Sequence, residues 1–383
     1  MGDHHHPVEL MIGEARWQDL VVYFDENPEE AKHIVNPAHG RTMLHLLCSV
    51  GACPWYLIKK VAELYPKAIT LQEKRYGDTP LHLSCRNSQV TIKKSIGLLE
   101  SMERYEKQQE LERKEPLATP GGVDEQRPHF SRPVGGVLVR NRFGGTPLHS
   151  ACNHNAAFEV IQALVSADPR IVSVTTHDNI PPIATLYTSY IQTIPGYMAV
   201  AKALKGEDQS GAGHFQRFWR KLAFLATCYL GQTRVLDPGR LILHGLLRSG
   251  NLQINFYKLP LKHDPSLAKV ADEDGNLALH LLVERRPFRL KEREAIESTL
   301  QAHPEAVHAR NNSGDFPLIL AIRNKIPWRN GLDVLVKTGP TTVQKRDPMT
   351  DLLPFQLAAC EGGNVALDTT YKLLTVQPDL LQI

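Results

Sequence analysis

A short sequence motif recurs along the 383-residue chain and constrains its fold more than any other feature. The motif is a glycine, a threonine, a leucine and a histidine, followed three residues later by a cysteine, and its fullest copies are centred on His45, His82 and His149. Weaker copies place Ala184, His244, His280, Ile319 and Gln356 in the histidine position. Five of the seven spacings between successive copies lie between 35 and 39 residues. A fixed period of this length indicates an array of structural repeats.

A second marker keeps the same phase. A proline that ends an apolar run lies 15 or 16 residues before the next histidine position at Pro66, Pro169, Pro265, Pro304 and Pro340. Because the two markers are unrelated in composition, their common phase supports the repeat independently. The two longer spacings, before His149 and before His244, each indicate a repeat that carries an insertion.

The residue types within one copy predict a helical hairpin. Glycine tolerates the positive φ of a tight turn, threonine caps a helix, and proline fits the first helical position. The histidine falls near the third helical position, where a side chain can bond back across the turn as in a capping box. A second apolar run, such as residues 55–64, has helical spacing. Because one hairpin cannot bury its apolar face alone, the sequence predicts an all-α solenoid of about eight stacked repeats.

The segments Thr79–His82 and Thr146–His149 resemble the turn and first helix of the ankyrin repeat. The resemblance covers roughly residues 10–383 outside the two insertions, and it implies an ankyrin-type scaffold that binds a partner. The repeats run nearer about 36 than 33 residues, and a proline ends the second helix where Gly-Ala-Asp is usual. Together with Asp272–Asn276, Arg346-Asp-Pro and Phe218-Trp219, these departures are similar to the expanded ankyrin families of diatom-like algae.

The pattern divides the chain into six segments. We expect a disordered N-terminus at 1–9, N-terminal repeats at 10–100, a charged helix extension and disordered loop at 101–139, central repeats at 140–192, an insertion with a flexible link and a Phe/Trp-bearing helix at 193–240, and C-terminal repeats at 241–383. The loop is either a tolerated insertion or a partner-binding arm. The aromatic residues Phe215, Phe218 and Trp219 are expected in the core rather than in a ligand site.

Composition narrows the class of partner. A net charge of +3 is too even for a nucleic-acid-binding surface. The first residues lack the apolar stretch of a secretory signal, and the most apolar run, residues 222–230, is about half of a membrane span. The six cysteines show no disulfide spacing. We therefore expect a cytoplasmic or nuclear monomer that contacts neither nucleic acid nor membrane.

The most tempting chemistry is the pairing of histidine and cysteine on one helical face, as in His45 and Cys48. A structural zinc ion needs four ligands at about 2.0–2.3 Å, whereas packed helices lie roughly 8–10 Å apart. We interpret the histidine as a turn-bonding residue and the cysteine as a small core residue. No motif for a metal, a cofactor or a catalytic residue stands out, and none is predicted.

The favoured function is therefore a non-enzymatic scaffold that binds another protein through its turn tips and concave face. The candidate contact residues are those that flank the turns, namely Arg75, Tyr76, Arg142, Phe143, His177, Asp178, Asn312 and Asp315. Turn formation alone would also account for any single one of them. The alternative is an enzyme or a small-ligand-binding protein with a pocket around residues 193–240.

Overall fold

A computed structural model describes residues 7–36, 38–86, 92–114, 136–193, 209–231, 241–248, 257–284 and 290–378. The chain forms two compact units, an N-terminal unit of Met1–Ile194 and a C-terminal unit of Pro195–Ile383. In the described residues the secondary structure is helical apart from one small antiparallel pair, β1 (Ile34–Asn36) and β2 (Arg41–Thr42), and an isolated bridge between Ala271 and Leu277.

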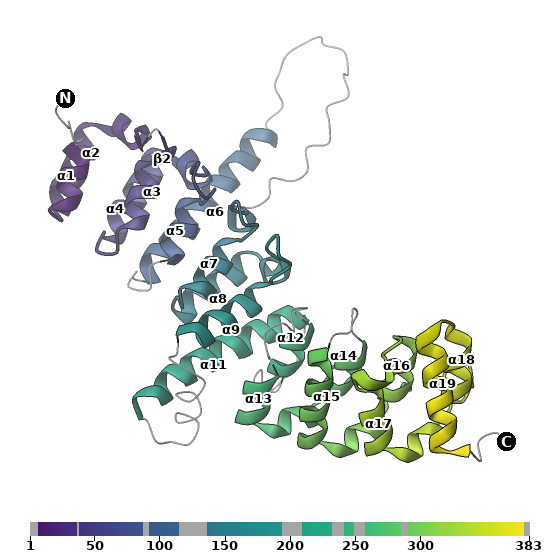
Figure 1. Cartoon of the computed structure of the whole chain (residues 1–383). Coiled ribbons are helices and arrows are strands. Elements are labelled where there is room, and N and C mark those ends of the chain that lie inside the picture. The colour runs from purple at the N-terminus through teal and green to yellow at the C-terminus, as the bar shows by residue number, and fades with distance from the viewer. Residues whose placement is uncertain are drawn as a thin grey trace, which may run out of the picture. The chain divides into compact units, whose positions relative to one another are not determined.

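The N-terminal unit is a stack of helical hairpins (Figure 1). Its helices are α1 (Pro7–Gly13), α2 (Trp17–Glu26), α3 (Met43–Ser49), α4 (Trp55–Leu64), α5 (Pro80–Arg86), α6 (Ile92–Lys114), α7 (Pro147–Asn153), α8 (Phe158–Ala167) and α9 (Pro182–Thr193). The helices that carry the marker position pack in one layer, in the order α3, α5, α7 and α9. The second helices form the other layer, in which α4 contacts α6 and α6 contacts α8.

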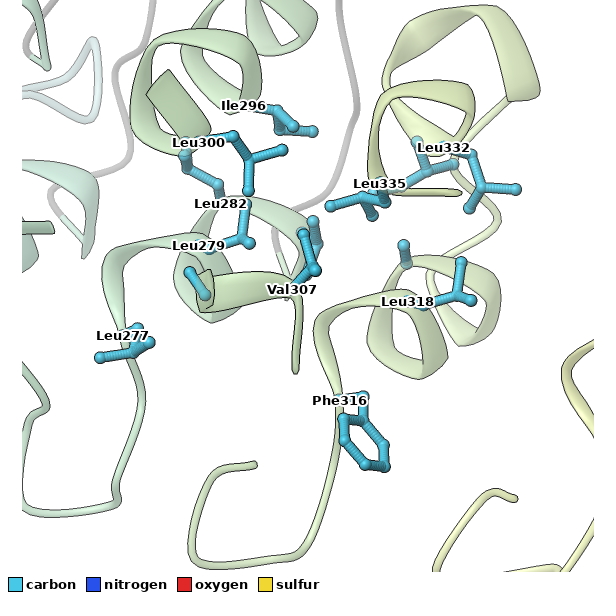
Figure 2. Packing of buried hydrophobic residues seen from close by; sticks show 14 of the residues in the cluster. Leu277, Leu279, Leu282, Ile296, Leu300, Val307, Phe316, Leu318, Leu332 and Leu335 are labelled. Carbon is cyan, nitrogen blue, oxygen red and sulfur yellow. The ribbon is translucent and has the colours of Figure 1, made fainter. Parts of the chain in front are cut away.

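The C-terminal unit repeats this arrangement. Its helices are α11 (Gln209–Leu230), α12 (Ile242–Arg248), α13 (Lys258–His263), α14 (Ala278–Glu284), α15 (Leu290–Ala302), α16 (Pro317–Arg323), α17 (Leu332–Thr338), α18 (Pro354–Glu361) and α19 (Asn364–Val376). Helices α12, α14, α16 and α18 pack in one layer, and α13, α15 and α17 in the other. The core between the layers is mainly aliphatic, with Tyr257 and Phe316 as its aromatic members, and Figure 2 shows Leu282 of α14 beside Leu300 of α15.

All eight marker positions lie in described helices, so the predicted all-α repeat stack is confirmed. In seven of these repeats a residue with positive φ lies five positions before the marker. Five of these residues are glycines, and the other two are Asn179 and Asp351, each with a φ of 57°. At Gly144, a Cβ atom would come within 2.7 Å of the backbone nitrogen of His177, so both the φ of 77° and the close approach favour glycine there.

The prolines of the second marker each open a short 3-10 helix directly after the second helix. These segments are η2 (Pro66–Ile69), η4 (Pro169–Ser173), η6 (Pro265–Lys269), η7 (Pro304–His308) and η9 (Pro340–Gln344). Proline fits this first position because its missing N–H has no partner there. Each segment buries apolar or small side chains, such as Ala68 and Ile69, so the end of the second helix becomes part of the core.

Three details refine the predicted segments. Helix α1 begins at Pro7 and buries Val8, so residues 7–9 are helical rather than disordered. The charged segment after residue 100 continues α6 without a break as far as Lys114. Within the segment 101–139, the expected disordered loop lies outside the described residues at 115–135. Within the segment 193–240, the flexible link was expected at residues 205–213 and lies outside the described residues up to residue 208. Helix α11 begins at Gln209, so residues 209–213 are helical rather than a flexible link.

Candidate functional site

The marker histidines connect each turn to the next repeat. In His149, Nδ1 lies 3.1 Å from the backbone nitrogen of Thr146 and 2.9 Å from its hydroxyl, while Nε2 lies 3.0 Å from the carbonyl oxygen of Ile180. Because a carbonyl oxygen only accepts, Nε2 carries the proton and Nδ1 accepts from Thr146. The same link to the following repeat joins His45 to Asp78 at 3.1 Å, His82 to Gly145 at 3.0 Å and His244 to Asn276 at 2.9 Å.

These histidines are neutral at pH 7. Burial lowers the pKa of His45, His82 and His149 to about 4 in each case, against an ordinary value of 6.5. The neutral imidazole is required here because a protonated Nδ1 could no longer accept the threonine N–H. The predicted role of the histidine, bonding back across its turn, is confirmed in all three copies.

The turn tips of the N-terminal unit are joined in a row by backbone hydrogen bonds. The N–H groups of Lys74, Arg142 and His177 donate to the carbonyl oxygens of the preceding tips, which belong to His39, Tyr76 and Phe143, at 2.6, 2.8 and 3.0 Å. Polar side chains fix each tip from inside. The Asn141 Oδ1 accepts from the N–H groups of Phe143 at 3.0 Å and Gly145 at 2.9 Å. The tips therefore present their exposed side chains in a fixed order.

Aromatic and basic residues gather on two neighbouring tips of this row. The rings of Tyr76 and Phe143 stack with centroids 6.2 Å apart and an interplanar angle of 29°. The Arg75 guanidinium lies 4.9 Å from the centre of the Tyr76 ring, within the range of a cation–π contact. Phe143 is 58% exposed, and Arg142 beside it is exposed as well. We call Arg75, Tyr76, Arg142 and Phe143 the tip patch.

The other candidate residues fall at three different places. His177 and Asp178 are exposed on the next tip of the same row. Asn312 is exposed on a tip of the C-terminal unit, where its Nδ2 donates to the carbonyl oxygen of Glu273 at 2.8 Å. Asp315 points inward, because it is only 6% exposed and its carboxylate lies 3.0 Å from the guanidinium of Arg323. Asp315 is therefore a structural residue of its turn rather than part of an outer surface.

Buried ion pairs beneath the tips were not anticipated from the sequence. The carboxylate of Asp78 is fully buried, lies 2.6 Å from the Arg86 guanidinium and accepts from Asn141 Nδ2 at 3.0 Å. In the C-terminal unit Arg248 pairs with Asp272, and Arg323 pairs with both Asp315 and Asp347. The signal that could have revealed them is an arginine four residues after the marker, one helical turn further along the same face.

The cysteines that follow the markers fill the interior. Cys48, Cys85 and Cys152 are at most 1% exposed, and burial raises the pKa of the Cys85 thiol to about 12. Among the described residues, no group of three histidine, cysteine, aspartate or glutamate side chains could hold a metal ion. The geometry thus accounts for the histidine–cysteine pairs as turn and core residues.

The described part of the 193–240 insertion contributes to the core of the C-terminal unit. Phe215 stacks on Trp219 with centroids 5.5 Å apart, and His263 meets the Trp219 ring edge-on at 4.6 Å. Phe218 is only 2% exposed. Phe215 and Phe218 are therefore buried, as expected for core residues, whereas Trp219 is half-buried and packs against the core. A hollow elsewhere, lined by Ile322, Lys325 and Val365 among others, has a volume of about 10 Å³, the space of roughly one water molecule.

None of the helices that the structure describes is both long and apolar enough to cross a membrane.

Comparison with known proteins identifies the repeat. A family model described as Ankyrin repeat matches residues 143–174, which run from Phe143 through α7 and α8 to Val174, directly after η4. A search of curated proteins gives no match to the chain.

Solved structures of two ankyrin-repeat proteins also match. The ankyrin repeat domain of Bcl-3, a member of the IkappaB protein family, is 15% identical, with a TM-score of 0.33 and coverage of 78% of this chain and 99% of that one. An ankyrin repeat protein from Leishmania major is 13% identical, with a TM-score of 0.32 and coverage of 94% and 99%. Both TM-scores are low, so neither likeness bears on the function. Residues 143–174 match the ankyrin repeat, and the same caps and turns recur before and after them, so the chain contains an ankyrin repeat within a stack of ankyrin-type helical repeats.

Proposed function

We propose that the chain is a non-enzymatic scaffold that binds another protein through the turn tips of its N-terminal unit. The observation that carries this proposal is the tip patch. Phe143 is 58% exposed and stacks on the Tyr76 ring, and the Arg75 guanidinium lies over the same ring. The backbone of the Phe143 tip is fixed by hydrogen bonds to both neighbouring tips. Tyrosine and arginine are among the residues that dominate binding energy at protein interfaces, and aromatic residues are enriched there.

Stability and binding use different residues of the same repeat. The apolar residues of the first helices, such as Leu81 and Leu148, are at most 1% exposed and hold the stack together. The patch residues lie outside this packing. Because ring stacking and hydrogen-bonded turns fix the patch before a partner arrives, little conformational entropy is lost on binding.

The proposal has several finer parts. We extend the contact surface to His177 and Asp178 on the next tip, to the concave face beside α5 and α7, and to Asn312 as a separate contact of the C-terminal unit. We also propose a monomer in a reducing compartment, the cytoplasm or the nucleus, which agrees with the free thiols of the six cysteines. The repeat length and the prolines after the second helices support placement in the diverged type similar to that of diatom-like algae.

No observation in the described residues favours the alternative of an enzyme or a small-ligand-binding protein with its pocket around residues 193–240. The aromatic side chains of α11 that could have lined such a pocket pack against one another and against His263.

The test compares two triple variants of the full chain as bait for a partner. One removes the patch through Arg75→Ala, Tyr76→Ala and Phe143→Ala. The control removes one cation and two aromatic rings from the same unit, through Trp55→Ala, Tyr56→Ala and Lys93→Ala at exposed positions where α4 and α6 begin. We expect the control to retain the protein that the wild type captures and the patch variant to lose it. Retention by both variants, with unchanged melting temperatures, would contradict the proposal.

A further inference from the structure

We infer that the turn-tip row of the N-terminal unit binds an extended segment of a partner protein that is rich in aspartate and glutamate. The inference rests on the proposed function and adds the chemistry of the partner. It starts from the distribution of charge at the tips, which is uneven although the whole chain carries only +3.

The basic residues of two neighbouring tips face outward and the acidic ones face inward. Lys74, Arg75, Arg140 and Arg142 are all exposed. The side chain of Glu73 is fully buried, where it accepts from the N–H groups of Arg75 and Tyr76. Asp78 is buried on Arg86. The carboxylates of Glu73 and Asp78 are thus held inside the turns, and the exposed side chains of Arg75, Arg140 and Arg142 give the outer face positive charge.

The aromatic rings add an apolar surface to this positive face. Phe143 is largely exposed, and the Arg75 guanidinium lies over the neighbouring Tyr76 ring. A partner side chain such as leucine or phenylalanine can rest on the Phe143 ring while flanking carboxylates pair with Arg75 and Arg142. Covering the arginines with apolar atoms removes water and strengthens these ion pairs.

The row favours an extended ligand. Neighbouring repeats of packed helices are spaced by roughly 10 Å, so the tips that carry His39, Tyr76, Phe143 and His177 span about 30 Å. An extended chain rises about 3.3 Å per residue, so about three residues connect neighbouring tips and about ten span the row.

A protein segment fits these observations better than a nucleic acid. Basic and aromatic residues also bind single strands, but such domains usually have a pI above about 9, whereas this chain has a pI of 8.4.

The test measures fluorescence polarisation of a labelled peptide of about 12 residues, in which glutamates flank two central leucines, with the full chain at roughly physiological salt. A second peptide has glutamine in place of every glutamate, and a thymidine oligonucleotide is the third probe. We expect saturable binding of the acidic peptide alone, with a Kd below about 100 µM. Equal binding of the glutamine peptide, tighter binding of the oligonucleotide, or no binding would overturn the inference.

Variants locate the binding. The double variant Arg75→Gln with Arg142→Gln neutralises two tip cations. We expect it to lower the affinity for the acidic peptide about tenfold, because each exposed ion pair changes the affinity by a few-fold. Phe143→Ala is expected to weaken it by about fivefold or more. The matched control, Lys59→Gln with Lys93→Gln, changes the net charge equally on α4 and α6 and is expected to change the affinity less than twofold. Equal losses in both double variants would place the binding elsewhere.

Competition separates the two proposals. If the patch triple variant loses the captured partner and the acidic peptide displaces that partner from the wild type, both proposals stand. Loss of the partner in the triple variant without displacement by the peptide would refute only the acidic chemistry. Retention of the partner in the triple variant would refute the proposed function itself.

Discussion

The buried marker histidines predict that the N-terminal unit loses stability steeply as the pH falls. His45, His82 and His149 have folded-state pKa values of about 4, whereas an unfolded histidine titrates near 6.5. Above pH 6.5 both states are neutral and the full stability is present. Between pH 6.5 and 4 each of these histidines is protonated in the unfolded state but not in the folded state. The free energy of unfolding therefore decreases by about 1.4 kcal/mol for each histidine and each unit that the pH falls.

One variant isolates this effect at a single site. His149→Gln preserves the cap, because the chain already uses glutamine in this position. In the repeat of α18, the Gln356 side chain accepts from the N–H of Leu353 at 2.9 Å. Glutamine can also donate to the Ile180 carbonyl, but it does not titrate. Between pH 7.5 and pH 5, titration of His149 lowers the free energy of unfolding of the wild type by about 2 kcal/mol, and the variant does not lose this amount.

The measurement is urea unfolding followed by circular dichroism, for both proteins, from pH 7.5 to 4.5. Carboxylates titrate in both proteins and cancel in the difference. We expect the free energies of unfolding to converge or cross as the pH falls, with the variant gaining on the wild type by about 1.4 kcal/mol per unit below pH 6.5. Parallel pH profiles would refute the assignment of His149 as a buried neutral residue.

Three further predictions concern single residues. Leu81→Ala should lower the free energy of unfolding by about 2–5 kcal/mol, and a loss below about 0.5 kcal/mol in chemical denaturation would mean that the repeat register is wrong. Gly144→Ala should cost about 1–3 kcal/mol because of its positive φ, whereas Gly13→Ala, which has open space around it, should cost little in the same melts. Arg86→Ala leaves the Asp78 carboxylate buried without its guanidinium, so we expect a loss of about 3–5 kcal/mol at pH 7. Replacing Asp78 by asparagine in that variant should restore part of the loss, and no restoration would contradict the pairing.

Much of the fold could be predicted because its signals are local. The turn residue, the cap and the histidine lie within five positions of one another, so they appear together in the sequence. Two turns lack the glycine that marks the other copies. Asn179 and Asp351 adopt the positive φ that glycine provides elsewhere, which asparagine and aspartate tolerate better than other residues with a side chain.

The candidate surface was predicted less completely because side-chain direction depends on distant elements. Asn312 and Asp315 belong to one turn, yet only Asn312 faces outward, because the buried Asp315 carboxylate forms an ion pair with Arg323 of the following helix. Tyr76 and Phe143 stack although a long insertion separates them in the chain. Their contact follows only once α5 and α7 are known to be neighbours.

The central claim is that the tip patch binds a protein partner, and site-specific photo-crosslinking tests this claim most directly. A photoreactive phenylalanine analogue replaces Phe143 in one protein and Tyr56, an exposed aromatic residue at the start of α4, in another. Our account predicts that light links a discrete protein to position 143 in cells and leaves position 56 without that product. The same products from both positions, or none from position 143, would contradict it.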